Sequence, residues 1–352
     1  MNITFLVGNG FDMSAGVDTS YRSFYNWYYL QPSRTADIQN FKQEIKKDIE
    51  NGGKNWADLE TGLGKFTSQF STADVDIFFE CYEDAVENII TYLEQEKNKF
   101  DIASITENDV ACLMNGILNF YQELNPEDRN TFEKILESDR MCNTSFNFIS
   151  FNYTDVFDRC IEKIAGIPIK EWEHDGIKRY AEINPQVLHI HGTSNEYPIL
   201  GVSEECHIAN RELLTVPHFA SIMIKSQSVA SIRQLWYTQA DRTIEKSQII
   251  CILGMSLGSS DSTWWTKIME WLEADKERHL ILFWHTKTPP SRRSVLQYNQ
   301  QTDIVRDFMV DYSCLTSSGA EEIRKQIHVV FNTDKVLRIS LFPASEKELV
   351  LT

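Results

Sequence analysis

The sequence lacks the features that would place it in a secreted, membrane-spanning or zinc-binding class. Its 7 cysteines are odd in number and none stands in a C-x-x-C pair, which argues against a zinc ribbon and a disulfide framework. No apolar run approaches the roughly 20 residues of a membrane span, and no basic region followed by a long apolar stretch opens the chain. There is no internal repeat and no low-complexity segment. We therefore expect a cytoplasmic protein with no membrane partner.

Basic residues are also scarce. The chain has 34 lysine and arginine residues against 51 aspartate and glutamate residues, a net charge of −17. A surface of this sign repels a phosphate backbone, so general nucleic-acid binding is not expected. Lys42, Lys46 and Lys47 are interleaved with acidic residues, as on a solvated helix face. The length of 352 residues and the 42% hydrophobic content are those of a globular protein with a sizeable core.

Short apolar runs bounded by turn residues predict the strands. They lie at 3–7, 145–151, 187–191, 248–254, 279–284 and 328–331. Runs this continuous are typical of strands covered on both faces, as in a parallel sheet flanked by helices. We therefore expect an α/β, Rossmann-like fold with a mostly parallel central sheet.

The interval between the first two predicted strands carries helical patterns. The clearest apolar stripe runs from Ile77 to Leu93 at helical spacing. Thr106 begins a capping-box pattern, and Asn125 before Pro126 marks a further helix start. The sequence thus predicts a large α-helical insertion after the first strand.

These patterns define the expected domains. Residues 1–20 and 141–335 form a Rossmann-like nucleotide-binding domain, 21–140 the α-helical insertion and 336–352 a C-terminal tail. The dense aromatic residues of 21–29 favour core packing, with a stacking surface as the alternative.

Four polar segments follow predicted strands, where open α/β sheets bind their ligands. The first is Gly8-Asn9-Gly10-Phe11-Asp12, directly after the run 3–7. Without a Cβ, Gly8 and Gly10 can take positive φ and let a pyrophosphate approach, and the next helix would offer its N–H groups. A simple turn is the alternative for this segment alone.

Two further segments have the same position relative to a strand. Asn152, within Ser150 to Asp155, can hydrogen-bond a ribose hydroxyl or a water, whereas Asn152 or Thr154 can instead cap the next helix. The segment from Gly254 to Asp261 is a second candidate anion site between a strand and a helix, with Asp261 as a cap or a ribose ligand.

The remaining segment is His189-Ile190-His191-Gly192. On a strand the two histidines would project to the same face, and Gly192 would leave space for a ligand. Metal binding is an alternative, but it needs a third protein ligand and no cysteine or carboxylate pattern lies nearby. We therefore expect no metal.

Taken together, the segments resemble those of the AbiH family of bacterial phage abortive-infection proteins. The resemblance spans roughly 3 to 285 and rests on short motifs in this order: Val7 to Asp12, Trp56 to Glu60, Phe151 to Thr154, His189 to Gly192, and Gly254 to Leu257 with Asp261. It implies a phage-defence protein with a phage-derived trigger, and it leaves a homo-oligomer open.

The same order is similar to that of sirtuin-like NAD-binding folds. By that similarity Gly8 and Gly10 face the pyrophosphate, Asn152 lies near the nicotinamide ribose and His191 is the catalytic histidine. The implied NAD-binding set is completed by Asn9, Phe11, Asp12, Thr154, Gly254, Ser256, Leu257 and Asp261. Asn9, Asp12 and Thr154 depart from the sirtuin pattern, and the zinc cysteines of sirtuin deacetylases are missing. Protein deacetylation is therefore not expected.

If NAD is the ligand, the expected reaction is hydrolysis of the nicotinamide–ribose bond by an NAD glycohydrolase. Nicotinamide leaves as a neutral molecule, so a general acid is not needed. Asn152 would orient the ribose or a water, and His191 would accept a proton at neutral pH. Two alternatives remain: a nucleotide sensor that acts through a partner, and a toxin that targets nucleic acid.

Overall fold

A seven-stranded sheet with the order β3-β4-β2-β1-β5-β6-β7 forms the centre of the protein. The computed structural model describes residues 1–337 apart from 167–168, 233, 292, 314–316 and 334, so the predicted tail at 336–352 lies almost wholly outside the described residues. The strands are β1 (Asn2–Val7), β2 (Thr144–Ser150), β3 (Lys170–His174), β4 (Ile177–His189), β5 (Ile249–Leu253), β6 (His279–Trp284) and β7 (Ile327–Phe331). Every neighbouring pair is parallel except the β3–β4 hairpin. The predicted α/β class with a mostly parallel sheet is confirmed.

Each predicted apolar run overlaps a strand, but the strand predicted at 187–191 begins much earlier in the structure. Strand β4 begins at Ile177 and ends at His189, so the apolar run covers only its last part. Strand β3 was not expected at all, because its residues alternate between exposed and half-buried at the sheet edge. A strand that buries so little surface carries no apolar run in its sequence.

Helices cover both faces of the sheet. The described residues form 14 α-helices: α1 (Gly10–Ser14), α2 (Tyr21–Tyr29), α3 (Ala36–Glu50), α4 (Leu59–Phe66), α5 (Val75–Lys97), α6 (Glu107–Leu118), α7 (Pro126–Ser138), α8 (Val156–Glu162), α9 (Phe219–Met223), α10 (Lys225–Ile232), α11 (Gln234–Lys246), α12 (Ser262–Glu273), α13 (Val295–Val310) and α14 (Ser317–Arg324). The predicted capping box at Thr106 and the Asn125 cap are both present. None of the helices in the described part of the chain has the length and apolar character of a membrane span.

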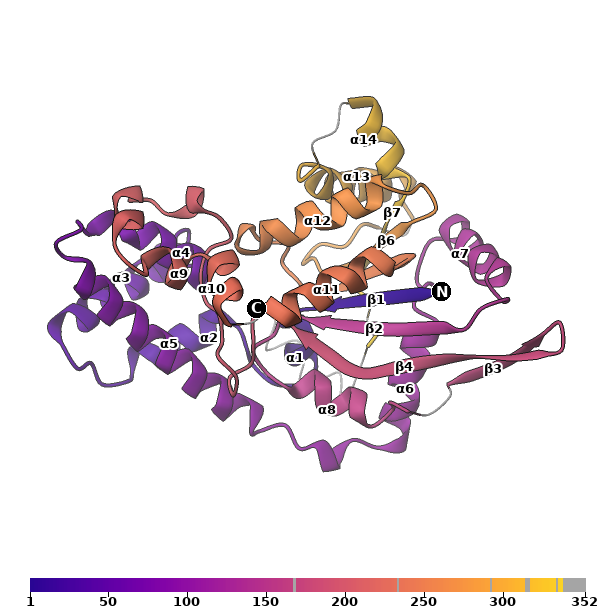
Figure 1. Cartoon of the computed structure of the whole chain (residues 1–352), viewed down its shortest axis with the longest axis horizontal. Coiled ribbons are helices and arrows are strands. Elements are labelled where there is room, and N and C mark those ends of the chain that lie inside the picture. Colours follow the sequence, from indigo (N-terminus) through magenta and orange to yellow (C-terminus); the bar gives the residue numbers. More distant parts are fainter. Residues whose placement is uncertain (167–168, 233, 292, 314–316, 334, 338–352) are drawn as a thin grey trace.

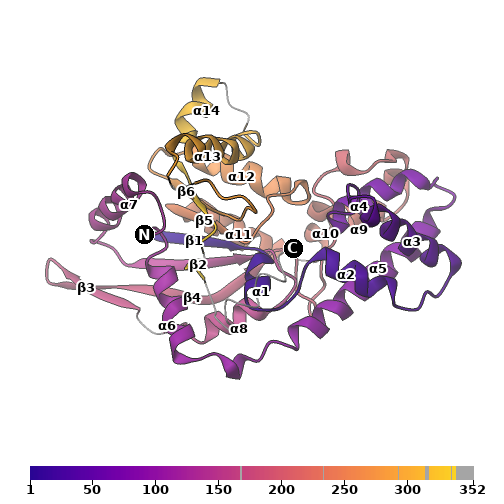
Figure 2. The same ribbon diagram turned by 180° about the vertical axis from the view of Figure 1, so that it is seen from behind.

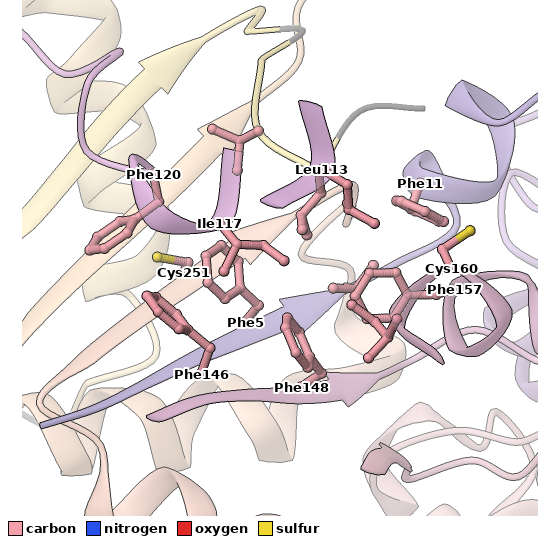
Figure 3. Close-up of a cluster of buried hydrophobic side chains, with 14 of the residues drawn as sticks. Phe5, Phe11, Leu113, Ile117, Phe120, Phe146, Phe148, Phe157, Cys160 and Cys251 are labelled. Carbon is pink, nitrogen blue, oxygen red and sulfur yellow. The ribbon is translucent and has the colours of Figure 1, made fainter. Parts of the chain in front are cut away.

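Alternate residues of the central strands supply two separate cores. On one face Phe5 and Phe148 pack with α6 and α8, and Figure 3 shows the Phe5 ring close to that of Phe120. On the other face Leu6 packs with α11, α12 and α13. The residues of β1 are therefore covered on both sides, as the continuous apolar run predicts.

A third core holds together what we call the helical lobe, formed by α2 to α5 with the segment 200–224. Figures 1 and 2 show the lobe at one end of the protein, facing the arrowheads of β1 and β2, whereas α6 and α7 lie along the sheet. Phe24, Tyr25 and Tyr28 are buried in it. Tyr21 and Trp27 are partly buried against it, so most of the aromatic residues of 21–29 do serve core packing.

Lys42 is an exception to the expected solvated helix face. Its side chain is only 3% exposed. The ammonium donates to the carbonyl oxygens of Gln31 and Pro32 and lies 3.8 Å from Asp84 Oδ2. Sequence spacing could not reveal this burial, because the partners come from outside α3.

Candidate functional site

A cleft lies where the carboxyl ends of the central strands meet the helical lobe. Its empty space of about 720 Å³ includes part of the open solvent at its mouth. The sheet contributes residues that follow β1, β2, β4 and β5, and the lobe contributes Tyr21, Asp58, Glu60, Ile89 and Leu93. Segments far apart in the sequence thus share one cavity.

The glycines after β1 pack against the loop that follows β5. The N–H of Gly8 donates to Leu253 O and that of Gly10 to Gly254 O, each at 2.9 Å. A Cβ on Gly10 would lie 2.5 Å from Gly254 Cα. The prediction of positive φ at Gly8 and Gly10 is wrong, since only Gly254 of the three has it, at +68°. These glycines join two loops tightly at the floor of the cleft.

Asp12 is the buried centre of a small polar network. Its Oδ2 accepts from Thr154 Oγ1 at 2.5 Å and its Oδ1 from Asn152 Nδ2 at 3.1 Å. Burial raises the pKa of the Asp12 carboxyl to about 7, although the hydrogen bonds from Thr154 and Asn152 lower it. The alternative role of Asn152 and Thr154 as helix caps is wrong, because α8 begins without a side-chain cap.

The side-chain amide of Asn152 uses only one of its two polar atoms in hydrogen bonds within the described residues. The residue is 4% exposed and lines the cleft. Its amide nitrogen donates to Asp12, while its Oδ1 is buried without a hydrogen-bond partner among the described residues. A buried acceptor without a donor is unfavourable, and a ligand that brings a donor would remove that cost.

The two histidines reach different partners. Strand β4 ends at His189, so the expectation that both project to the same strand face is wrong. His189 Nδ1 lies 3.0 Å from Asn152 O and its Nε2 2.8 Å from Asp158 Oδ2, away from the cleft lining. His191 lines the cleft, with Nε2 3.2 Å from Asp261 Oδ1 and its ring stacked on Tyr153.

Lys225 connects the two sides of the cleft. Its Nζ lies 2.8 Å from both Glu60 Oε2 and Asp261 Oδ1. Burial lowers the pKa of Lys225, but the carboxylates of Asp261 and Glu60 outweigh it and raise that pKa above its usual value. Asp261 stands at the start of α12 without acting as a side-chain cap, so its carboxylate is committed to Lys225 and His191.

Glu60 is a buried carboxyl group with two kinds of partner. Burial raises its pKa more than Lys225 lowers it, and Asp58 and Asp261 add to the rise. The hydroxyl of Tyr153 lies 2.7 Å from Glu60 Oε1 and 2.8 Å from Ile199 O. Its one proton can be donated to only one of these two acceptors at a time.

Most residues that the sequence singles out line the cleft. They are Gly8, Asn9, Asp12, Asn152, Thr154, His191, Ser256, Leu257 and Asp261. Gly10 and Gly254 lie at the contact between the loops, and the Phe11 ring packs on Phe157 in the core with centroids 4.8 Å apart. Sequence reasoning missed Tyr21, Glu60 and Lys225. Glu60 belongs to the motif Trp56 to Glu60, so the family resemblance could have identified it. Lys225 lies in none of the motifs.

Among the described residues, no group of three or more histidine, cysteine, aspartate or glutamate side chains is arranged to hold a metal ion. The chain is an α/β protein with a partly enclosed cleft at the carboxyl edge of a mostly parallel sheet, the edge where open α/β sheets bind their ligands. The chain belongs to the family described as Bacteriophage abortive infection AbiH, whose family model matches residues 4–283. None of the curated proteins compared with the chain matches it.

Proposed function

We propose that this protein is a cytoplasmic phage-defence effector that binds NAD or a related dinucleotide in the cleft and hydrolyses the nicotinamide–ribose bond. Membership of the AbiH family suggests the role in abortive infection. The observation that carries the chemical part is the presence of Asn152 and His191 in one cleft, each already oriented by a carboxyl group, Asp12 and Asp261 respectively.

The sheet topology supports a Rossmann-like assignment related to the sirtuin-like group. With β3 set aside, the parallel strands β1, β2, β4, β5, β6 and β7 number one to six along the chain, and the sheet places them as 3-2-1-4-5-6. This is the doubly wound order, in which ligands bind where the order reverses. Here that point lies between β1 and β5, and the helices α2 to α5 would be an insertion beside it.

The proposed mechanism uses few groups. Asn152 Oδ1 accepts from a ribose hydroxyl or an attacking water, which satisfies its missing hydrogen bond. His191 Nε2 lies 3.2 Å from Asp261 Oδ1, and this carboxylate stabilises the imidazolium that forms when His191 takes a proton from water. Nicotinamide leaves as a neutral molecule, and the carboxylates of the cleft stabilise the positive charge that develops on the ribose.

The test is nicotinamide release from NAD by the purified protein. We expect His191→Ala and Asn152→Ala each to reduce the rate by on the order of 10²-fold or more. His174→Ala and Asn98→Ala, which change the same residue types outside the cleft lining, should leave it unchanged. Unchanged turnover in both cleft variants would contradict these roles.

Binding of NAD without turnover would instead support the alternative of a nucleotide sensor that acts through a partner. Activity can require a phage-derived trigger or the assembly of a homo-oligomer. The assay is therefore repeated with extracts of phage-infected cells added to the purified protein. RNA and DNA cleavage should be absent, since four carboxyl groups and a single lysine line the described cleft.

A further inference from the structure

The cleft combines aromatic rings with carboxyl groups, and both its sheet side and its lobe side supply them. Tyr21, Phe151, Tyr153 and Trp265 line the cavity. Asp58, Glu60 and Asp261 line it as well. Burial and, to a smaller extent, the carboxylates of Glu60, Asp58 and Asp261 raise the pKa of the Tyr21 phenol. Aromatic faces and carboxylates both attract cations.

The cleft offers little to an anion at the same place. Among the described lining residues Lys225 is the only lysine or arginine, and its ammonium lies 2.8 Å from both Glu60 and Asp261. A phosphate placed there would compete with two carboxylates for one cation. The pyrophosphate of a dinucleotide would therefore lie outside this part of the cleft.

A second observation at the same cavity points to a ligand. The Oδ1 atom of Asn152 is buried and has no hydrogen-bond partner among the described residues, although Asn152 lines the cleft. A carboxamide or hydroxyl donor on a bound ring or ribose would satisfy it.

From the aromatic rings, the carboxylates and this unpaired acceptor, we infer that the cleft binds a flat heteroaromatic cation between its two sides and discriminates against the neutral ring of the same shape. The class of ligand follows from the lining. Its identification with the pyridinium ring of oxidised NAD rests on the proposed function, and it predicts tighter binding of NAD⁺ than of NADH.

The test compares two ligands that differ in charge and hardly in shape. Binding of 1-methylnicotinamide, a cation, and of nicotinamide, which is neutral, is measured by calorimetry at low ionic strength. We expect the cation to bind about tenfold more tightly. Asp58→Asn should reduce this ratio about threefold or more, since asparagine keeps the helix cap of α4 while the charge is lost.

Asp101→Asn is the matched control, because Asp101 also caps a helical turn but does not line the cleft. It should leave the ratio unchanged. Equal affinity for the two ligands, no binding of the cation at millimolar concentration, or an unchanged ratio in Asp58→Asn would each overturn the inference. Nicotinamide release from NAD is measured separately. Turnover without charge preference would leave the proposed function standing, and charge preference without turnover would leave the inference standing.

Discussion

The two walls of the cleft are built in different ways. The sheet wall consists of Asp12, Asn152 and His191, which follow buried parallel strands. The lobe wall consists of Asp58, Glu60 and Lys225, which belong to the helical lobe or directly follow its segment 200–224. Strand ends fix the sheet wall, whereas the lobe wall depends on helix packing and on one buried ion cluster.

The difference in construction goes with a difference in chemistry. The sheet wall holds the amide and imidazole groups that the proposed mechanism uses. The lobe wall holds Asp58, Glu60 and Lys225. Asp261, which follows β5, connects Lys225 to His191, so the charges of the lobe wall reach the imidazole through one carboxylate.

The largest expected effect comes from breaking the connection between the walls with Lys225→Met. Two carboxyl groups, Glu60 and Asp261, would lose their shared ammonium in a buried place. Loss of one partner of a buried ion pair costs about 3–5 kcal/mol in the free energy of unfolding. Denaturant unfolding measures this loss.

Lys46→Met is the control for Lys225→Met, because the Lys46–Glu50 pair is exposed at 4.0 Å. It should change stability by less than about 0.5 kcal/mol. Adding Glu60→Gln to Lys225→Met should restore part of the loss. A cost below about 1 kcal/mol for Lys225→Met would show that the cluster does not hold the walls together.

The same contrast explains what could be predicted from the sequence. The sheet wall was predictable because apolar runs such as 3–7 locate strands, and parallel strands bring their carboxyl ends to one edge. Asp12, Asn152 and His191 each stand within five residues of a strand end. Their side-chain partners were not predictable, since Asn152 and Asp12 are separated by 140 positions.

The lobe wall could not be predicted in this way. Glu60 and Lys225 lie 165 positions apart and meet only because the segment 200–224 packs against α4 and α5. The sequence predicts that a lysine at the start of a helix is exposed, because most lysines are. Only the tertiary packing buries Lys225. The same limit applies to Lys42 in α3. The hairpin strand β3 could not be predicted either, because its residues are exposed or half-buried and form no apolar run.

A smaller effect is expected from disturbing the floor of the sheet wall with Gly10→Ala. The added Cβ would lie 2.5 Å from Gly254 Cα, which is backbone and cannot move aside cheaply. We expect a loss of roughly 3 kcal/mol in the free energy of unfolding. In Gly53→Ala the new Cβ meets nothing within 4 Å and only the φ of +64° is strained, so about 1 kcal/mol is expected. Equal losses in the two variants would mean that the loop contact is not tightly packed.

The most gradual expected effect concerns Asp12 and is a dependence on pH, spread over the range between about pH 4 and pH 7. Burial raises the pKa of Asp12 from 3.8 to about 7, against the hydrogen bonds from Thr154 and Asn152 and the charge of His189, with Asp158 adding to the rise. The folded state therefore holds this proton more tightly than the unfolded chain. The stability that it contributes is complete below about pH 4 and is lost as pH rises towards 7, at about 1.4 kcal/mol per pH unit.

Asp12→Asn removes the titrating group without changing its size, so the free energy of unfolding of the variant should lack this slope. The measurement is the difference between native protein and variant at pH 5, 6, 7 and 8, in which all other titrations cancel. The difference should fall between pH 5 and 7 and level off above 7. A constant difference in unfolding free energy across this pH range would mean that Asp12 stays ionised while it accepts hydrogen bonds from Thr154 and Asn152. The sheet wall would then carry a negative charge, as the lobe wall does.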